Sequence, residues 1–258
     1  MSFESSIEWT QATWNPVTGC SEISPGCAHC YAARFANRLK CMGNPRYTNG
    51  FRVTMHDDLI DLPLSWKRPT RIFVNSMSDL FHEEIPLEFI EAVFTTISTA
   101  SWHRFQILTK RASRLLEISP YLSWPSNLLM GVTVENQDYI WRLEKLKKVP
   151  AAVKFVSCEP LLGQLNLPLE DLDWVIVGGE SGPGARTMDL NWVREIRDQC
   201  SLVKLPFFLK QLGGTRNKRG EQLAQLDGQL WKELPEILLM KSYPYKENDV
   251  RRNRVRSL

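Results

Sequence analysis

From residue 70 onward, short apolar runs alternate with longer segments of amphipathic pattern. The runs are rich in Val, Ile, Leu and Phe, which is typical of strands buried on both faces of a parallel sheet. The segments between them have the period of helices that cover such a sheet. The pattern therefore predicts repeated βαβ units. The predicted strands are Arg71–Asn75, Phe105–Thr109, Leu128–Val134, Val153–Ser157, Trp174–Val177 and Pro206–Lys210, and the predicted helices are Leu87–Ala100, Ala112–Glu117, Gln137–Lys147 and Asn191–Gln199.

One more short segment, Thr10–Trp14, precedes these units. Pro16 and Gly19 follow it, and both residue types are typical of the loop that ends a strand. A chain of 258 residues, 43% of them hydrophobic, is long enough to bury the single large core that such a sheet needs. We therefore predict an α/β fold over residues 1–240, a partial or nearly closed parallel (β/α) barrel of TIM-like type with six to seven strands.

Polar residues follow the predicted strands from residue 70 onward. In a parallel α/β barrel the C-terminal strand ends meet at one rim, where active sites lie. Any single residue has a plainer explanation, since Ser78 or Asp79 could cap the helix that follows. The repetition along the chain favours a shared ligand pocket. The polar groups are Ser76–Asp79, Lys110–Arg111, Glu135–Asn136, Cys158–Glu159, Gly178–Ser181 and Lys210–Gln211.

Three cysteines, Cys20, Cys27 and Cys30, lie in the loop after the first predicted strand. Cysteine thiolates hold iron–sulfur clusters, and four of them normally occupy every iron of a cubane. Three thiolates leave one iron open to a ligand that the protein does not supply. The loop therefore indicates chemistry at a 4Fe–4S cluster rather than electron storage alone.

A zinc protein that binds nucleic acid without catalysis is the alternative. The three cysteines would then need His29, Cys41 or His56 as a fourth, tetrahedral ligand. A structural zinc site usually has two pairs of ligands, and here the second pair is missing. Zinc also gives no reason for polar groups at the strand ends. In this alternative the contacts to phosphates come from a basic cluster and the C-terminal tail; the cluster is Lys210, Arg216, Lys218 and Arg219.

The net charge of +3 is unevenly distributed, because segment 241–258 carries +4 and the remainder is close to −1. We treat 241–258 as a basic tail, which either contacts phosphates or is a solvated terminus. The chain has no run of about 18 uncharged apolar residues, which a membrane span would need. It also begins without the apolar core of a signal peptide. Clustered cysteines in such a chain more often bind metal than form disulfides, so we expect a cytoplasmic protein.

The chain resembles the radical S-adenosylmethionine (SAM) superfamily and, within it, a phage-associated family of unknown function with a three-cysteine motif. The resemblance extends from roughly residue 8 to residue 214. One departure is the six-residue gap between the first two cysteines, where three is commonest in the superfamily. The matching segments are TWNPVTGC, GCAHCYA, RIFVNSMSDLFHE, ILTKR, GVTVEN, FVSCEPLLG, DWVIVGGESGPGAR and PFFLKQLGG.

The resemblance implies a radical SAM enzyme with a 4Fe–4S cluster on the three cysteines and SAM on the open iron. Reductive cleavage of SAM there releases a 5′-deoxyadenosyl radical, which abstracts hydrogen from a substrate. An external electron donor of flavodoxin or ferredoxin type is implied as well. The substrate is unknown, and phage association with the basic tail favours a nucleic acid or nucleotide. No catalytic residue is assigned.

The resemblance and the strand-end positions also suggest cofactor contacts. His29 holds the aromatic position before the third cysteine, which packs against adenine in radical SAM proteins. Glu135 suits ribose hydroxyls, because a carboxylate accepts two hydrogen bonds. Gly178-Gly179-Glu180 follows a late strand, so it differs from the early Gly-Gly-Glu of the superfamily. The suggested cofactor-binding residues are His29, Ser76, Ser78, Asp79, Lys110, Glu135, Glu159 and Glu180.

Two further kinds of residue need an interpretation. Arg186 or Lys210 could meet an anionic substrate, since both side chains are cationic. Cys158 directly follows the predicted strand Val153–Ser157, where a substrate or redox role is conceivable. A buried cysteine is, however, common as a small apolar residue, and packing is the favoured explanation for Cys158.

Overall fold

The computed structural model describes residues 5, 7–215 and 224–239. The basic tail 241–258 lies outside the described residues, as do Arg216, Lys218 and Arg219. Their contacts with phosphates therefore stay predictions. Within the described part of the chain, no helix has the length and apolar composition needed to cross a membrane.

Seven strands form one sheet with the order β1-β4-β5-β6-β7-β8-β9, and every neighbouring pair is parallel. This confirms the predicted α/β class and the repeated βαβ pattern. Each strand begins and ends within two residues of its predicted bounds. The strands are β1 (Ala12–Trp14), β4 (Arg71–Val74), β5 (Arg104–Thr109), β6 (Leu128–Thr133), β7 (Val153–Cys158), β8 (Trp174–Gly178) and β9 (Phe207–Gln211).

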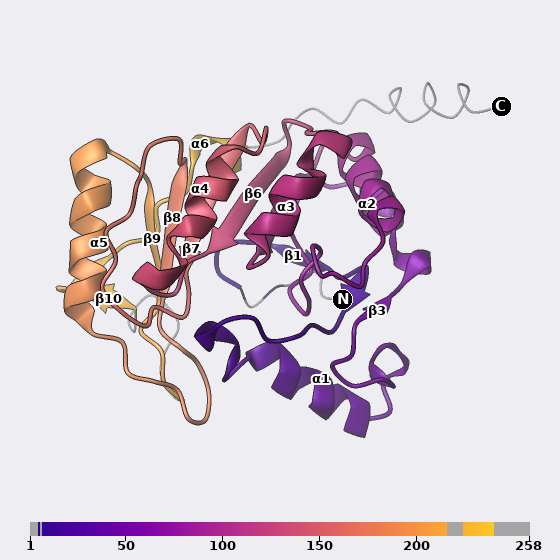
Figure 1. The fold of residues 1–258 in the computed structure, drawn as a ribbon, viewed down its shortest axis with the longest axis horizontal. Helices are drawn as coiled ribbons and strands as arrows, with labels where there is room; N and C mark the ends of the chain where they lie inside the picture. The colour runs from indigo at the N-terminus through magenta and orange to yellow at the C-terminus, as the bar shows by residue number, and fades with distance from the viewer. Residues whose placement is uncertain (1–4, 6, 216–223, 240–258) are drawn as a thin grey trace.

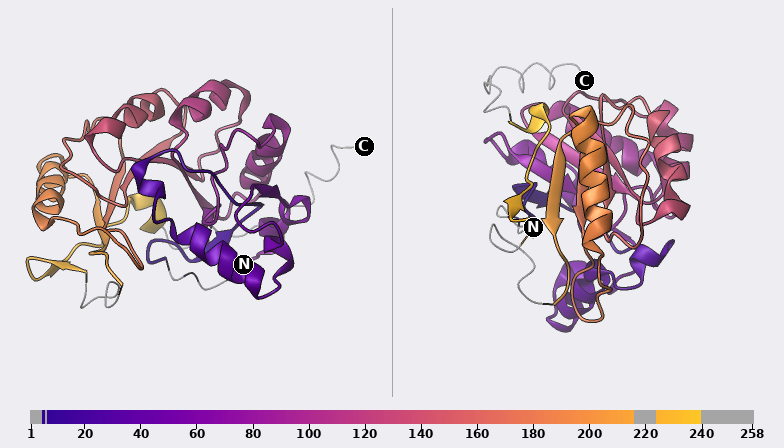
Figure 2. Two further views of the ribbon diagram at one scale, coloured as in Figure 1. Left: turned by 60° about the horizontal axis from the view of Figure 1, so that its bottom comes forward. Right: turned by 90° about the vertical axis from the view of Figure 1, so that its left-hand side faces the viewer.

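The sheet is curled into a half-barrel, with the main helices on its convex side (Figures 1 and 2). It stays open because β1 pairs only with β4, and β9 pairs within the sheet only with β8. The outer edge of β9 is partly covered by a later segment, since Leu209 N–H donates to Trp231 C=O. The fold is therefore a partial barrel of TIM-like type, as predicted.

The continuous apolar runs reflect burial on both faces of the sheet. On the convex face, side chains such as Ile72 and Val74 join the large core beneath the helices. On the concave face, Phe73 and its counterparts on the neighbouring strands form a second cluster with Trp9. This second cluster fills the barrel interior towards the N-terminal strand ends, so the open space lies at the C-terminal rim. Its other buried members are Leu129, Phe155, Trp174, Ile176, Phe208 and Leu238.

The helices differ from the predicted ones mainly at their ends. The segment predicted as helix 137–147 is a 3-10 turn followed by a shorter α-helix, and the last long helix continues four residues further than predicted. The helix that follows Cys30 was not predicted, because few large apolar residues mark its buried face, which carries Ala32 and Ala36. The helices are α1 (Tyr31–Cys41), α2 (Leu87–Thr99), α3 (Ala112–Ile118), α4 (Trp141–Lys147), α5 (Leu190–Val203) and α6 (Glu236–Leu239).

Short elements complete the described structure. Two antiparallel pairs lie outside the main sheet: β2 (Val17–Thr18) with β3 (Thr54–Met55), and β10 (Gln225–Leu226) with β11 (Gln229–Leu230). The 3-10 helices are Pro25–Cys27, Pro45–Tyr47, Asp57–Leu59, Leu62–Ser65, Ser119–Tyr121 and Gln137–Tyr139.

Candidate functional site

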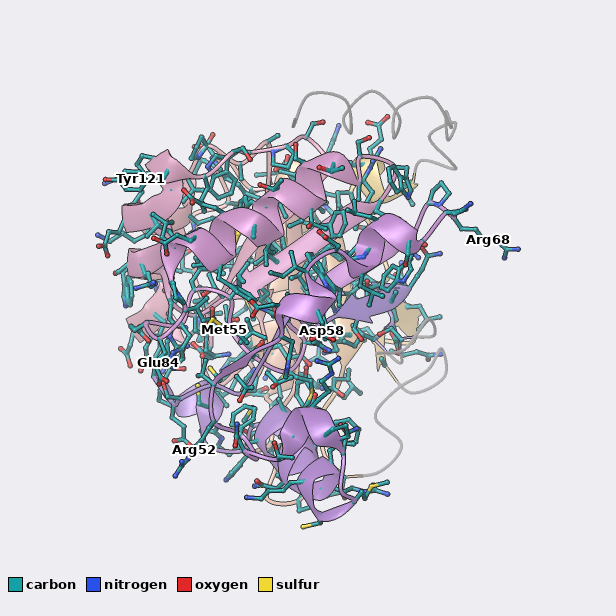
Figure 3. The ribbon with its side chains drawn as sticks, turned by 90° about the vertical axis from the view of Figure 1, so that its right-hand side faces the viewer. Arg52, Met55, Asp58, Arg68, Glu84 and Tyr121 are labelled. Carbon is teal, nitrogen blue, oxygen red and sulfur yellow. The ribbon has the colours of Figure 1, made fainter. Side chains whose placement is uncertain are left out.

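The three cysteines line the same two cavities beside the C-terminal ends of the strands. One, the cysteine cavity, is also lined by polar residues that follow β4 and β5. The other, the outer cavity, opens between the cysteine loop and residues that include Arg52 and Glu84, labelled in Figure 3. The cysteines thus lie between these two cavities.

Arg111, which follows β5, ties the cysteine loop to the sheet. Its guanidinium is buried and donates to Cys20 Sγ at 3.4 Å and to the Ser21 hydroxyl at 2.9 Å. It also pairs with Asp79 at 3.3 Å and with Glu83 at 2.9 Å. Burial raises the pKa of the Cys20 thiol to about 11, and the Asp79 carboxylate adds to the rise while Arg111 opposes it. Binding of iron at Cys20 therefore has to displace a proton.

Glu135, two residues after the end of β6, contacts the cysteine loop from the side of the sheet. Its carboxylate is fully buried, accepts from the Ser24 hydroxyl at 2.6 Å and pairs with Arg142 at 2.8 Å. A Cβ on Gly26 would lie 2.5 Å from Glu135 Oε1, so the close approach requires glycine. Both carboxylate oxygens are engaged by protein groups, and Glu135 does not line the cavities described here. This geometry favours a positioning role over contact with ribose.

The loop after β8 packs against the cysteine loop through Glu180. The Glu180 carboxylate accepts from His29 Nδ1 at 2.9 Å and from the Arg186 side chain and backbone N–H. Arg186 also donates to Pro25 C=O at 2.8 Å, and Arg34 donates to Ser181 C=O. Burial alone would raise the pKa of Glu180, but the hydrogen bonds from Arg186 and His29 outweigh it and lower the pKa to about 2.

The low pKa of Glu180 predicts that acid weakens the attachment of this loop. A carboxyl whose folded pKa is depressed stabilises the fold above its unfolded value, and this contribution is lost as pH falls through the folded value. The contribution of Glu180 is therefore complete above about pH 5 and lost towards pH 2. Urea unfolding of iron-free protein and of Glu180→Gln should show their difference in unfolding free energy shrinking across this range. A difference that stays constant from pH 5 to pH 2.5 would contradict the assignment.

The residues after β4 hold the β1 and β5 ends together and also line the cysteine cavity. Ser78 donates to Val17 C=O at 2.8 Å, and Ser76 donates to the Asn15 side chain at 3.1 Å. The buried Asp79 accepts from the Thr109 hydroxyl at 2.7 Å and from the backbone N–H of Lys110 at 3.1 Å.

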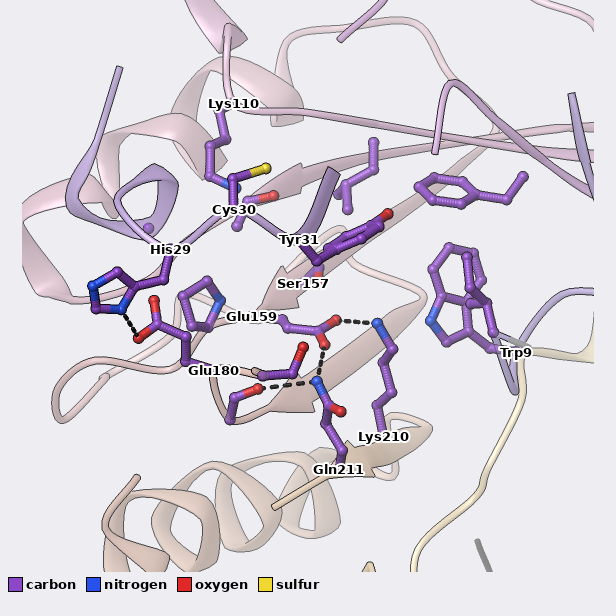
Figure 4. A pocket seen from close by; sticks show the side chains of 18 residues that line it. Trp9, His29, Cys30, Tyr31, Lys110, Ser157, Glu159, Glu180, Lys210 and Gln211 are labelled. Carbon is purple, nitrogen blue, oxygen red and sulfur yellow. Dashed lines mark hydrogen bonds and ion pairs between the residues drawn. The ribbon is translucent and has the colours of Figure 1, made fainter. Parts of the chain in front are cut away.

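A third cavity, which we call the inner cavity, lies at the C-terminal ends of β5 to β9 (Figure 4). It shares Cys30, Tyr31 and Lys110 with the cysteine cavity, so the two spaces adjoin. Lys210 Nζ donates to Glu159 Oε2 at 2.7 Å in its wall. Four of the suggested cofactor residues line it: His29, Lys110, Glu159 and Glu180.

The residues suggested as a fourth zinc ligand have other surroundings in the structure. Among the described residues, no three His, Cys, Asp or Glu side chains are placed to hold one metal ion. The suggested fourth zinc ligands are engaged elsewhere, because His29 bonds Glu180 and His56 lies 3.0 Å from the Thr18 hydroxyl. Cys41 is exposed at the end of α1. In a cubane each thiolate binds a different iron, so the three need not converge on one point.

Other residues were placed differently from the sequence interpretation or were missed by it. Cys158 is fully buried in the convex core with Cys200, which supports the packing explanation. Of the two cations suggested for an anionic substrate, Arg186 pairs with Glu180, whereas Lys210 lines the inner cavity. Arg111 was recognised only as part of a strand-end group, and Trp9 was not singled out. No sequence signal separates Arg111 from Lys110, since their partners come from distant segments.

Comparisons with known proteins identify a family. The family model described as "Protein of unknown function (DUF5131)" matches residues 4–235. No curated protein matches the chain. The phage association suggested by the sequence stays a prediction.

Several solved structures are similar in fold. A cysteine-to-alanine mutant of spore photoproduct lyase with dinucleoside spore photoproduct has a TM-score of 0.48 and 14% identity, over 77% of this chain and 63% of that one. Spore photoproduct lyase complexed with dinucleoside spore photoproduct has a TM-score of 0.46, with the same identity and coverage. The chain thus spans less than two thirds of these structures. At these scores the likeness supports no conclusion about function.

Proposed function

The chain belongs to the DUF5131 family, and from this starting point we propose that it is a radical SAM enzyme acting on a nucleic acid or nucleotide. Cys20, Cys27 and Cys30 would hold a 4Fe–4S cluster, with SAM on the open iron. When bound, these groups supply a 5′-deoxyadenosyl radical for hydrogen abstraction. The observation that carries the proposal is the placement of three cysteines in one cavity at the C-terminal rim of a parallel half-barrel.

The neighbouring residues have distinct roles in this proposal. Arg111 and Glu135 hold the cysteine loop against the sheet, so the loop is positioned before any cofactor binds. Lys110 reaches both cavities and can pair with a carboxylate such as that of SAM. Ser76, Ser78 and Asp79 line the cysteine cavity and are proposed to surround the amino acid part of SAM, while His29 and Glu180 lie beside the adenosine.

The concave aromatic cluster fills the N-terminal end of the half-barrel, so a ligand reaches the inner cavity from the C-terminal side. A donor of flavodoxin or ferredoxin type is proposed to deliver the electron.

Anaerobic iron loading tests the proposal directly. We expect about four irons per chain with matching sulfide, and release of 5′-deoxyadenosine when SAM and dithionite are added. Turnover with labelled SAM in extracts, followed by analysis of nucleic acids and nucleotides for altered species, would then identify the substrate. A protein that takes up one tightly bound zinc and no cluster under these conditions would overturn the proposal in favour of the zinc alternative.

Arg111→Lys should weaken iron retention without removing a ligand. Lysine keeps the charge but loses the planar fork that contacts Cys20, Ser21 and Asp79 together. Loss of such a supporting contact typically lowers metal affinity by about 10- to 100-fold. Iron release to a chelator should therefore be much faster in the variant. Arg114→Lys is the control, because Arg114 lies in helix α3 directly after Arg111 and its side chain donates to Ile85 C=O instead of to the cysteine loop. Equal release rates in the two variants would refute the role.

A further inference from the structure

Two buried polar atoms, on residues that line the inner cavity, have no hydrogen-bond partner among the described residues. They are the side-chain oxygen Oε1 of Gln211, at the end of β9, and the indole nitrogen Nε1 of Trp9, ahead of β1. Each residue is only 2% exposed. A buried donor or acceptor left unpaired is unfavourable, because it has lost its hydrogen bonds to water without replacing them. A ligand that pairs with both atoms would therefore be bound selectively.

We infer that these two atoms belong to a substrate subsite for a nucleobase with a lactam edge, that is, a ring N–H beside a ring carbonyl. Uracil, thymine, guanine and hypoxanthine have such an edge. The inference deepens the proposed function and rests on it for the identity of this ligand as the substrate.

The orientation of the Gln211 amide is settled by its partners. Its Nε2 donates to Glu159 Oε1 at 2.9 Å and to Gly179 C=O at 3.1 Å. Both partners are acceptors only, so the amide nitrogen must face them and Oε1 is left over. Lys210 holds the other carboxylate oxygen of Glu159 at 2.7 Å and fixes the arrangement. Gln211 Oε1 is therefore a hydrogen-bond acceptor, and a ligand must provide an N–H group to pair with it.

The Trp9 ring is equally fixed and offers a donor. Its ring centroid lies 4.7 Å from that of Phe73 and 6.0 Å from that of Trp174, both in edge-on geometry. Its backbone C=O accepts from Gln106 at 3.2 Å. Figure 4 shows the indole nitrogen on the side of the ring that faces Lys210. Because an indole N–H can only donate, the ligand must present an acceptor here.

The surroundings favour a neutral ring with a carbonyl. The charge of Lys210 is balanced by Glu159, so a phosphate or carboxylate gains little at this position. Phe73, Tyr31 and Trp9 supply aromatic surface suited to a flat ring. The Lys210 ammonium has further N–H groups beyond the one that Glu159 accepts, and a carbonyl oxygen can accept two hydrogen bonds whereas a ring nitrogen accepts one. A lactam therefore fits better than the amino-pyridine edge of adenine.

The test measures binding of uridine to the iron-loaded protein saturated with SAM, by calorimetry. Uridine carries the N–H flanked by carbonyls, and 3-methyluridine lacks only that N–H. A short oligouridylate distinguishes a base within a strand from a free nucleoside. Trp9→Phe removes the indole N–H and keeps the ring, and Trp231→Phe is the matched control, because Trp231 Nε1 is also buried and unpaired but lies outside the inner cavity.

We expect uridine to bind alongside SAM, and to bind about fivefold more weakly when the base is methylated or when Trp9 is replaced, since one hydrogen bond is worth about 1 kcal/mol. Trp231→Phe should bind as wild type does. Equal binding of uridine and 3-methyluridine, no binding of uridine, or displacement of SAM by uridine would each overturn the inference. Weakened SAM binding in Trp9→Phe would show that the atoms contact the adenine of SAM, and would overturn it too. Release of 5′-deoxyadenosine is measured separately, so these outcomes are distinguishable from failure of the proposed function.

Discussion

Cys27→Ala is expected to abolish both iron–sulfur loading and release of 5′-deoxyadenosine. Cys27 lines both cavities with Cys20 and Cys30, so its loss leaves two thiolates for a cluster that needs three. The fold itself should survive, because Cys27 is only partly buried and its Sγ lies 3.8 Å from the Ser24 hydroxyl, a weak contact.

The matched control is Cys41→Ala. Cys41 ends α1, eleven residues after Cys30, and is exposed. This variant should keep full iron content and 5′-deoxyadenosine release. Iron analysis and product chromatography on both variants decide the matter: undiminished 5′-deoxyadenosine from Cys27→Ala would refute the assignment of the cluster ligands.

Arg142→Met is expected to lower the free energy of unfolding by about 3–5 kcal/mol, because it removes the nearer cation of a buried ion pair and leaves the Glu135 carboxylate with only Lys110, 3.6 Å away. The side chains of Arg142 and Glu135 are each 1% exposed, and their charged atoms are 2.8 Å apart. Arg142 also donates to Thr133 C=O at 2.9 Å, so a backbone acceptor loses its partner as well. Urea unfolding of the purified variant measures the loss.

Two comparison variants make this prediction specific. Arg194→Met removes an arginine from an exposed pair with Asp227 and should lower the free energy of unfolding far less than Arg142→Met does. The double variant Glu135→Gln with Arg142→Met should recover part of the loss, because the buried negative charge is then gone. If Arg142→Met lowers the free energy of unfolding no more than Arg194→Met does, Arg142 does not hold the Glu135 carboxylate. The proposed role of Glu135 in positioning Ser24 would then be wrong as well.

The strands were predictable because burial on two faces leaves a strong trace in a sequence. Arg71–Val74 and its counterparts read as uninterrupted apolar runs, since alternate side chains enter the convex core and the concave cluster. Helix α1 left no such trace, because alanines form its buried positions. The predicted strand ends differ from the observed ones by one or two residues. A strand ends where its hydrogen bonds to the neighbouring strand end, and the local sequence does not contain that information.

The strand-end polar residues were predicted to meet at one rim, and they do, but their separate tasks could not be predicted. Glu135 and Glu159 each follow a strand, yet Glu135 is buried beneath Gly26 whereas Glu159 lines the inner cavity. Beyond the last residue of a strand the two-residue alternation ends, so the sequence no longer indicates which way a side chain points.

By itself, the sequence determined the parallel α/β architecture, the loop that carries Cys20, Cys27 and Cys30, and the rim where polar groups gather. These depend on hydrophobic periodicity and short spacing, which are local properties of the chain. Only the tertiary structure decided that Arg111 contacts Cys20, that Glu135 supports the loop, and that Trp9 and Gln211 line one cavity. Such contacts join segments up to about two hundred residues apart, and the curvature of the sheet, which no local pattern encodes, brings them together.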